Sequence, residues 1–184
     1  MSKTQSVMLA LGTIAPQFSL FDVVSGKMLG LKRSAKDKAT VIMFICNHCP
    51  YVKHVNKELT RLANDYLSKD VNFIAISSND IHNYPDDSPE NMKINAQKES
   101  YPFPYLFDET QEVAKAYQAA CTPDFYVFDS NYELVYRGQL DDSRPGNNIA
   151  LTGNSIREVL DCMLLNKSVD PIQKPSLGCN IKWK

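Results

Sequence analysis

Residues 40–52 read TVIMFICNHCPYV, and this stretch decides the fold because it joins a buried strand to an amphipathic helix. Residues 40–45 are apolar or β-branched throughout, which is typical of a strand buried on both faces. Residues 71–77 (VNFIAIS) predict a second buried strand. A strand–helix–strand unit predicts two parallel strands with a right-handed connection. Between the strands, apolar residues recur in steps of three and four, so the buried face of the helix is predicted at Val52, Val55, Leu59, Leu62 and Tyr66.

The sequence on either side of this unit predicts a hairpin, further helices and an antiparallel pair. Upstream, residues 18–31 are typical of a small hairpin that turns at Ser25-Gly26. The order predicts one α/β domain over residues 1–184, with helices on both faces of a mixed central sheet. The other predicted elements are a helix capped by Ser88 over 88–100, a short helix over 111–120, a strand pair at 125–128 and 133–137, a closing helix over 154–165 and an irregular C-terminal tail over 166–184.

Composition limits the class of partner and the compartment. The formal net charge of -1 argues against nucleic acid or an anionic membrane as a partner, since both need a clustered basic surface. No apolar run approaches the ~20 residues that span a bilayer. Residues 1–11 lack the basic start and long apolar core of a secretory signal, so we expect a cytoplasmic protein. Static disulfides are then unexpected among the five cysteines, and without a Gly-rich phosphate-binding loop we expect no cofactor.

Cys49 stands where the buried strand gives way to the helix. Pro50 suits the first helical position, which makes Cys49 the predicted N-cap. Backbone amides of the first helical turn and the helix dipole favour a thiolate there, and Lys53 and His48 would add positive charge. We therefore expect the pKa of Cys49 to lie below the ~8.5 of a free cysteine. The competing interpretation is an inert buried cysteine.

Cys46 and Cys49 form a C-x-x-C pair with two further interpretations. Three residues of extended chain span ~10 Å, whereas a disulfide needs Cα atoms ~4.4–6.8 Å apart, so the pair closes only if Asn47-His48 turns tightly. A disulfide and a buried structural Cys46 both stay open. A zinc site formed with His54 lacks a fourth ligand, because Leu59 occupies the matching position, and we expect no metal.

Six segments carry a family resemblance. Residues 15–22 (APQFSLFD) resemble the start of redoxin domains of the alkyl hydroperoxide reductase/thiol-specific antioxidant superfamily, and residues 44–52 resemble the thioredoxin active-site segment. Residues 121–125 (CTPDF) resemble the cis-proline loop of thioredoxin folds. Residues 84–90, 141–146 and 178–184 are similar to a peroxiredoxin-like subgroup. The resemblance implies a thioredoxin-like fold, antioxidant and cell redox homeostasis roles, and substrate contacts from Pro50, Tyr51, Thr122 and Pro123.

The departures from that pattern concern the second cysteine. Val52 stands where thioredoxins carry their second cysteine, Met43 stands where a buried acid is expected, and the threonine and proline of peroxiredoxins are missing. A second thiol must then come from Cys46, Cys121, Cys179 or an external reductant, whereas Cys162 is predicted to be structural. We predict a thiol–disulfide oxidoreductase that acts on protein or small-molecule disulfides with an external thiol reductant. The alternatives are a binding or chaperone-like module without turnover, and a weak thiol peroxidase.

Overall fold

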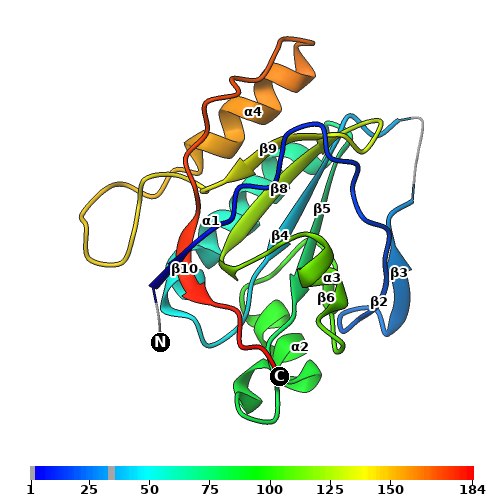
Figure 1. Cartoon of the computed structure of the whole chain (residues 1–184), viewed down its shortest axis with the longest axis vertical. Helices are drawn as coiled ribbons and strands as arrows, with labels where there is room; N and C mark the ends of the chain where they lie inside the picture. Colours follow the sequence, from blue (N-terminus) through cyan, green and yellow to red (C-terminus); the bar gives the residue numbers. More distant parts are fainter. Residues whose placement is uncertain (1–2, 33–35) are drawn as a thin grey trace.

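The computed structural model describes residues 3–32 and 36–184, and these ranges contain a seven-stranded mixed sheet in the order β3-β2-β6-β5-β4-β8-β9 (Figure 1). The neighbours β4, β5 and β6 are parallel, whereas the other pairs are antiparallel. The parallel centre and antiparallel flanks confirm the predicted mixed sheet and give the chain a thioredoxin-like fold. The strands are β2 (Ser19–Asp22), β3 (Lys27–Gly30), β4 (Ala39–Phe44), β5 (Val71–Ser77), β6 (Tyr105–Phe107), β8 (Asp124–Asp129) and β9 (Leu134–Gly138).

Helices cover both faces of the sheet, as predicted. One face of β4, with Val41 and Met43, packs against α1 (Pro50–Leu67), α2 (Pro89–Lys98) and α4 (Asn154–Leu164). The opposite face, with Ile42 and Phe44, packs under α3 (Glu112–Ala116) and the aromatic side chains beside it. The residues predicted to form the buried face of α1 are all buried: Val52, Val55, Leu59, Leu62 and Tyr66.

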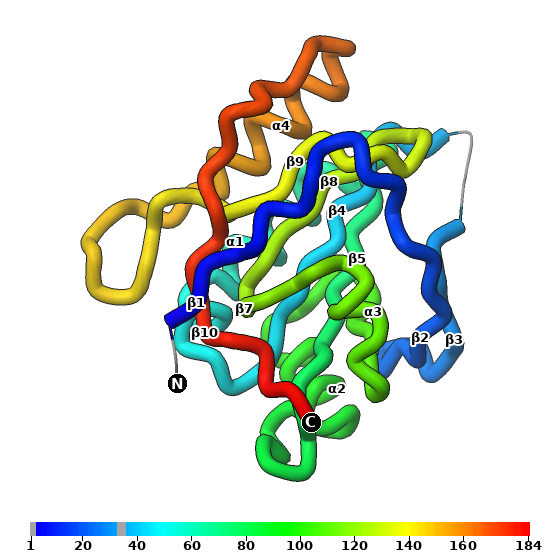
Figure 2. The backbone as a smooth tube through the Cα atoms, viewed as in Figure 1, coloured from blue at the N-terminus to red at the C-terminus, as the bar shows by residue number. Residues whose placement is uncertain are grey.

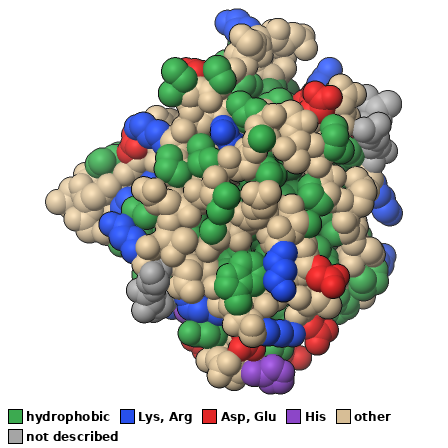
Figure 3. Space-filling model, viewed as in Figure 1, with side chains coloured by type: hydrophobic (Ala, Val, Ile, Leu, Met, Phe, Trp, Pro, Cys, Tyr) green, Lys and Arg blue, Asp and Glu red, His purple; other side chains and the backbone are tan. Residues whose placement is uncertain are grey.

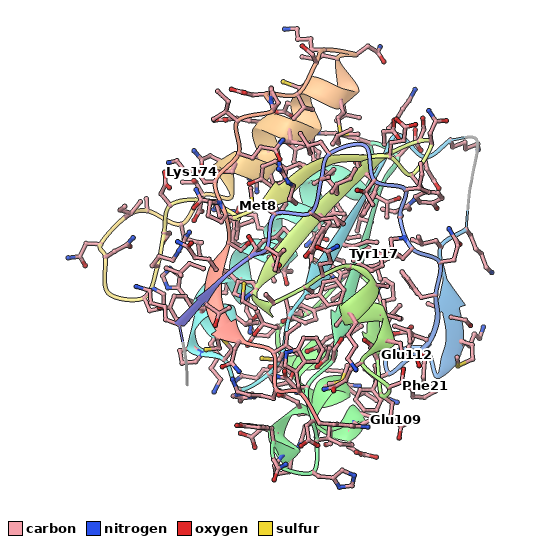
Figure 4. The ribbon with its side chains drawn as sticks, viewed as in Figure 1. Met8, Phe21, Glu109, Glu112, Tyr117 and Lys174 are labelled. Carbon is pink, nitrogen blue, oxygen red and sulfur yellow. The ribbon has the colours of Figure 1, made fainter. Side chains whose placement is uncertain are left out.

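Tyr117, labelled at the end of α3 in Figure 4, centres the aromatic core on that second face. Its ring lies 5.6 Å from Phe44 and 5.9 Å from Tyr126, centroid to centroid, and its hydroxyl donates to the Pro16 carbonyl at 2.8 Å. The edge-to-face packing of Tyr117 against Tyr126 adds to the stabilisation from burial alone. The N-terminal segment is thereby held against the sheet.

The C-terminal tail corrects one expectation, because it is not irregular throughout. Residues Leu177–Asn180 form β10, which lies between β1 (Lys3–Gln5) and β7 (Cys121–Thr122) in a separate three-stranded sheet over the described residues. Figure 2 shows the two ends of the chain running side by side. Gly178 suggested a break in structure, but it suits this strand because a Cβ there would overlap the Thr122 carbonyl oxygen.

None of the helices in the described ranges is long and apolar enough to cross a membrane. On the face seen in Figure 3, hydrophobic, basic and acidic side chains are interspersed.

Candidate active site around Cys49

Cys49 is the N-cap of α1, as predicted, with φ -66° and ψ 124° and with Pro50 as the first helical residue. Its side chain is fully buried, and its Sγ donates a hydrogen bond to the Thr122 carbonyl oxygen at 3.3 Å. The sulfur makes no capping hydrogen bond to α1. Because Sγ points at β7 instead, the first-turn amides contribute less than expected, although the Val52 amide still lowers the pKa of Cys49.

Neighbouring donors make Cys49 acidic. A hydrogen bond from the Cys46 thiol is the largest cause that lowers the pKa of Cys49 to about 5; burial opposes it, and the Cys179 thiol and the Val52 amide act in the same direction as Cys46. The groups that lower the pKa of Cys49 most are thus thiols and amides, rather than the charges of Lys53 and His48. On ionisation Cys49 ceases to donate to Thr122, and the neighbouring donors stabilise its anion.

Cys46 has the opposite tendency, although it lies only three residues away. Its Sγ lies 3.3 Å from Thr122 Oγ1 in the buried core. Burial, the neighbouring Cys49 and the charge of Asp87 raise the pKa of Cys46 well above its usual range. Cys46 therefore remains a protonated donor beside the Cys49 sulfur.

The tight turn that the C-x-x-C pair requires is present and is organised by Asp87. The Asn47 and His48 amides donate to Asp87 Oδ1 at 2.7 and 3.3 Å, and His48 Nδ1 lies 2.6 Å from Oδ2. Asn79 Nδ2 also donates to Oδ2, at 2.8 Å. Burial opposes ionisation of Asp87, but the donors from His48 and Asn79 prevail and lower its pKa. Sequence reasoning missed this residue, although it lies inside the 84–90 segment that carried part of the family resemblance.

The metal ligands considered from the sequence do not come together as a set. His54 Nε2 lies 2.8 Å from Ser143 Oγ, in a different part of the site. Among the described residues, Cys46, His48 and Asp87 do place potential ligand atoms within 4.8 Å of one another. However, each Asp87 oxygen already accepts two hydrogen bonds from the protein, so the carboxylate is fully engaged in holding the turn.

The peptide bond Thr122-Pro123 is cis, as the resemblance implied, and its loop faces Cys49. Pro50 is exposed at the start of α1, while Thr122 is buried and contacts the Cys49 sulfur through its carbonyl oxygen. Tyr51 and Pro123 line a small cavity next to the site, together with His54 and Arg144. The four predicted contact residues therefore lie around Cys49, and two of them border a hollow.

Of the other three cysteines, two lie next to the Thr122-Pro123 loop, Cys179 and Cys121, and Cys162 lies away from it. All five are thiols. Cys179 belongs to the same buried cluster as Cys46 and Cys49. Cys121 places its Sγ 3.8 Å from the Pro123 carbonyl, and burial raises its pKa. Cys162 lies on α4, half-buried and outside this cluster.

A second buried acid, Asp124, was also missed. It follows Pro123 on β8 and pairs with Phe44, while Met43 is an ordinary core residue. Tyr126 Oη donates to Asp124 Oδ2 at 3.1 Å. Burial is the largest influence and raises the pKa of Asp124 to about 7.

Comparisons with known proteins agree with the fold and identify the family. Residues 11–137 match the AhpC/TSA family. An uncharacterized conserved protein from Geobacillus kaustophilus is 61% identical, with 100% of this chain and 97% of that chain covered and a TM-score of 0.97. A hypothetical protein from Sinorhizobium meliloti is 42% identical over 98% of both chains, with a TM-score of 0.95.

A more distant structural match shows the fold alone. The thioredoxin domain of a thiol-disulfide oxidoreductase from Bacteroides vulgatus is 18% identical, with 82% of this chain and 98% of that chain covered and a TM-score of 0.62. No curated protein matches the chain.

Proposed function

Because the chain belongs to the AhpC/TSA family, we propose that it is a thiol–disulfide oxidoreductase whose nucleophile is the Cys49 thiolate. The observation that carries the proposal is the position of one sulfur. Cys49 stands at the start of α1, contacts the residue before a cis-proline, and has its pKa lowered to about 5. The thiolate is the reactive form of cysteine, and at neutral pH this residue exists mainly as the thiolate.

The proposed reaction is thiol–disulfide exchange. The Cys49 thiolate attacks one sulfur of a substrate disulfide, the sulfur–sulfur bond breaks, and the other substrate sulfur leaves as a thiolate that takes a proton from water. A second thiol then attacks Cys49 Sγ and releases the bound half of the substrate. An external thiol reductant returns the protein to its starting state. Pro50, Tyr51, Thr122 and Pro123 surround the reacting sulfur and would contact the substrate.

Cys46 supports this chemistry without being the first nucleophile. Its protonated thiol is the strongest single donor to the Cys49 anion, and its own pKa is raised. A donor that stays protonated stabilises the attacking sulfur in every turnover. Asp87 contributes by holding the turn that sets the two sulfurs against each other.

The burial of Cys49 favours a second candidate. With no exposed surface, the sulfur meets a substrate only after the segments over it move. A binding or chaperone-like module needs no such motion, since it would present the region beside Thr122-Pro123 to a protein partner with the cysteines unreacted. The two candidates differ in whether Cys49 is required.

The test is reduction of oxidised glutathione with dithiothreitol as the external reductant. We expect Cys49→Ser to reduce turnover at least ~100-fold, to the uncatalysed background, because the nucleophile is removed. Cys162→Ser is the matched control and should stay within about twofold of wild type, since that thiol lies outside the site. In wild type, the rate of Cys49 alkylation by iodoacetamide should follow a titration with a midpoint of about 5.

Unchanged turnover in Cys49→Ser, or a midpoint at the ~8.5 of an ordinary thiol, would favour the binding module. The peroxidase alternative has its own measurement. If hydrogen peroxide is consumed with thiol recycling as fast as glutathione disulfide is reduced, the protein is a peroxidase instead.

A further inference from the structure

The structure gathers three cysteine thiols around Thr122, and we infer that Cys179 of β10 is the thiol that resolves the mixed disulfide formed on Cys49. The inference rests on the proposed function and deepens it. It selects one of the possible second thiols and assigns a reaction step to the C-terminal strand. Three independent features of the site carry it: strand register, close backbone approach and local charge.

Strand register separates Cys179 from Cys121. In the antiparallel pair of β10 with β7, Cys179 lies opposite Thr122 and Asn180 lies opposite Cys121. Directly opposed residues project to the same side of a sheet, and successive residues project to opposite sides. Cys179 therefore shares the side of Thr122, whose hydroxyl contacts Cys46 Sγ at 3.3 Å. Cys121 projects to the other side and is not in the cluster that holds Cys46, Cys49 and Cys179.

Close backbone approach brings β10 to the reacting sulfur. A Cβ on Gly178 would overlap the Thr122 carbonyl oxygen, so the backbone of β10 is pressed directly against this atom. The same oxygen accepts the hydrogen bond from Cys49 Sγ at 3.3 Å. The strand also lies beside α1, the helix that Cys49 caps (Figure 1). Gly178, the residue before Cys179, and the Cys49 sulfur thus meet at one carbonyl group.

Local charge separates Cys179 from Cys46. A resolving thiol must ionise before it attacks. Cys46 lies within 4.8 Å of the Asp87 carboxylate, whose negative charge opposes a second anion. At Cys179, the positive charge of the Lys182 ammonium instead favours the thiolate. Lys182 is fixed in place because Nζ donates to the Asn180 carbonyl at 2.7 Å and to Asn180 Oδ1 at 2.9 Å.

The order of events follows from the same interactions. Burial and the neighbouring Cys49 raise the pKa of Cys179 to about 12 in the resting protein. Once Cys49 is bonded to a substrate sulfur, it no longer carries a negative charge, and that part of the increase disappears. Cys179 therefore becomes easier to ionise only after the first step. Burial persists at both thiols and both lose the part that comes from Cys49, but the Asp87 charge continues to oppose ionisation of Cys46, whereas Lys182 favours ionisation of Cys179.

The resolving step conserves atoms and electrons. The Cys179 sulfur attacks Cys49 Sγ of the mixed disulfide, forms the Cys49–Cys179 bond and displaces the substrate thiolate, which takes up the proton that Cys179 released. Cys49 and Cys179 are then oxidised together, and the substrate disulfide has been reduced to two thiols. A dithiol such as dithiothreitol reduces the new disulfide and completes the cycle.

The first experiment maps the disulfide in the full chain. The reduced protein is treated with one equivalent of oxidised glutathione, remaining thiols are blocked with N-ethylmaleimide, and a tryptic digest is analysed by mass spectrometry. Cys46 and Cys49 share one tryptic peptide, so the digest is repeated with Cys46→Ser. We expect that peptide to be joined to the Cys179 peptide in both proteins. An internal Cys46–Cys49 bond, or a link to Cys121, would overturn the inference.

The second experiment separates the two reaction steps. Cys179→Ser should keep the first step, glutathione addition to Cys49, within about twofold of wild type, while steady-state turnover falls at least ~10-fold and the Cys49–glutathione adduct persists. A merely structural role would not trap that adduct, and Cys162→Ser should not do so either. Full turnover without an adduct in Cys179→Ser would refute Cys179 while leaving the proposed function intact. Activity that remains in Cys49→Ser would instead refute the proposed function itself.

Discussion

The two sides of the Thr122-Pro123 loop each hold a cysteine and a buried carboxyl group. Negative charge is stabilised on one side and disfavoured on the other. On the Cys49 side, formed by Cys49 and Asp87, the pKa of the thiol falls to about 5 and the pKa of the carboxyl is lowered. On the Cys121 side, formed by Cys121 and Asp124, the pKa of the thiol rises and that of the carboxyl reaches about 7.

The balance between hydrogen-bond donors and the cost of burial explains this difference. Asp87 and Asp124 are equally inaccessible to water. Asp87 accepts from two backbone amides, an imidazole and an amide side chain. Asp124 accepts from the Phe125 amide and the Tyr126 hydroxyl, but the cost of burial exceeds the effect of its donors. Donors aimed at an anion offset the cost of removing it from water. The Cys49 side is therefore built to hold charge and the Cys121 side to exclude it.

The largest expected effect concerns the pH dependence of stability on the Cys121 side. The folded-state pKa of Asp124, about 7, lies above its unfolded value of about 3.9, so its contribution is complete below pH 4 and is lost as pH rises towards 7. That difference corresponds to about 4 kcal/mol. We expect the free energy of unfolding of wild type, measured in urea relative to Asp124→Asn, to fall by this order between pH 4 and 8. A constant difference over that range would contradict the charge-excluding character of this side.

The next largest effect concerns the turn on the Cys49 side. Asp87→Ala removes the acceptor for the turn amides and for His48, and we expect it to lower the free energy of unfolding by about 3 kcal/mol. Asp87→Asn should cost less, because one oxygen remains. The negative charge is lost in both variants, so the pKa of Cys46 should fall. Urea denaturation and thiol alkylation measure the two consequences, and equal stability of both variants with wild type would count against the turn's dependence on Asp87.

A smaller effect tests the donor that distinguishes Cys49 from Cys121. Cys46→Ala deletes the thiol that contributes most to the acidity of Cys49. We expect the pKa of Cys49 to rise from about 5 towards 6, which corresponds to about 1 kcal/mol of lost anion stabilisation. Cys46→Ser is the matched control, since a hydroxyl still donates and should retain most of the shift. The pH dependence of alkylation reports both, and an unchanged midpoint in Cys46→Ala would mean that another group acidifies Cys49.

The sequence predicted the parts of this comparison that are local. The apolar run of β4, the 3.6-residue period of α1 and the proline after Cys49 placed the strand, the helix and the cap correctly. The cis bond at Thr122-Pro123 followed from the family resemblance, since no local pattern specifies it. The strand, the helix and the cap are each specified by residues that lie close together in the sequence.

The parts that the sequence missed depend on distant partners. β10 contains a glycine and closely follows a proline, so its sequence does not indicate a strand. Gly178 suits the strand only because the Thr122 carbonyl of another strand lies against it. Asp87 stood in a polar loop whose link to Asn47 spans 40 positions. The sequence indicated first-turn amides and nearby charges as the groups that acidify Cys49, but it gave no sign of the Cys179 thiol, which comes from a distant strand. Tertiary packing, which no short window contains, decided each of these.

The smallest expected effect addresses the charge that the sequence proposed for Cys49. Lys53 lies one turn into α1, but it is exposed, and water and salt screen an exposed ammonium. We expect Lys53→Gln to change the midpoint of Cys49 alkylation by less than about 0.3 pH units, and raising the salt concentration should have a similarly small effect. Lys182→Gln is the informative partner, because that side chain is buried near Cys179 and should slow resolution of the glutathione adduct. A larger shift for Lys53→Gln than for Cys46→Ala would reverse the order proposed here, and long-range charge rather than directed donors would then set the acidity of the Cys49 side.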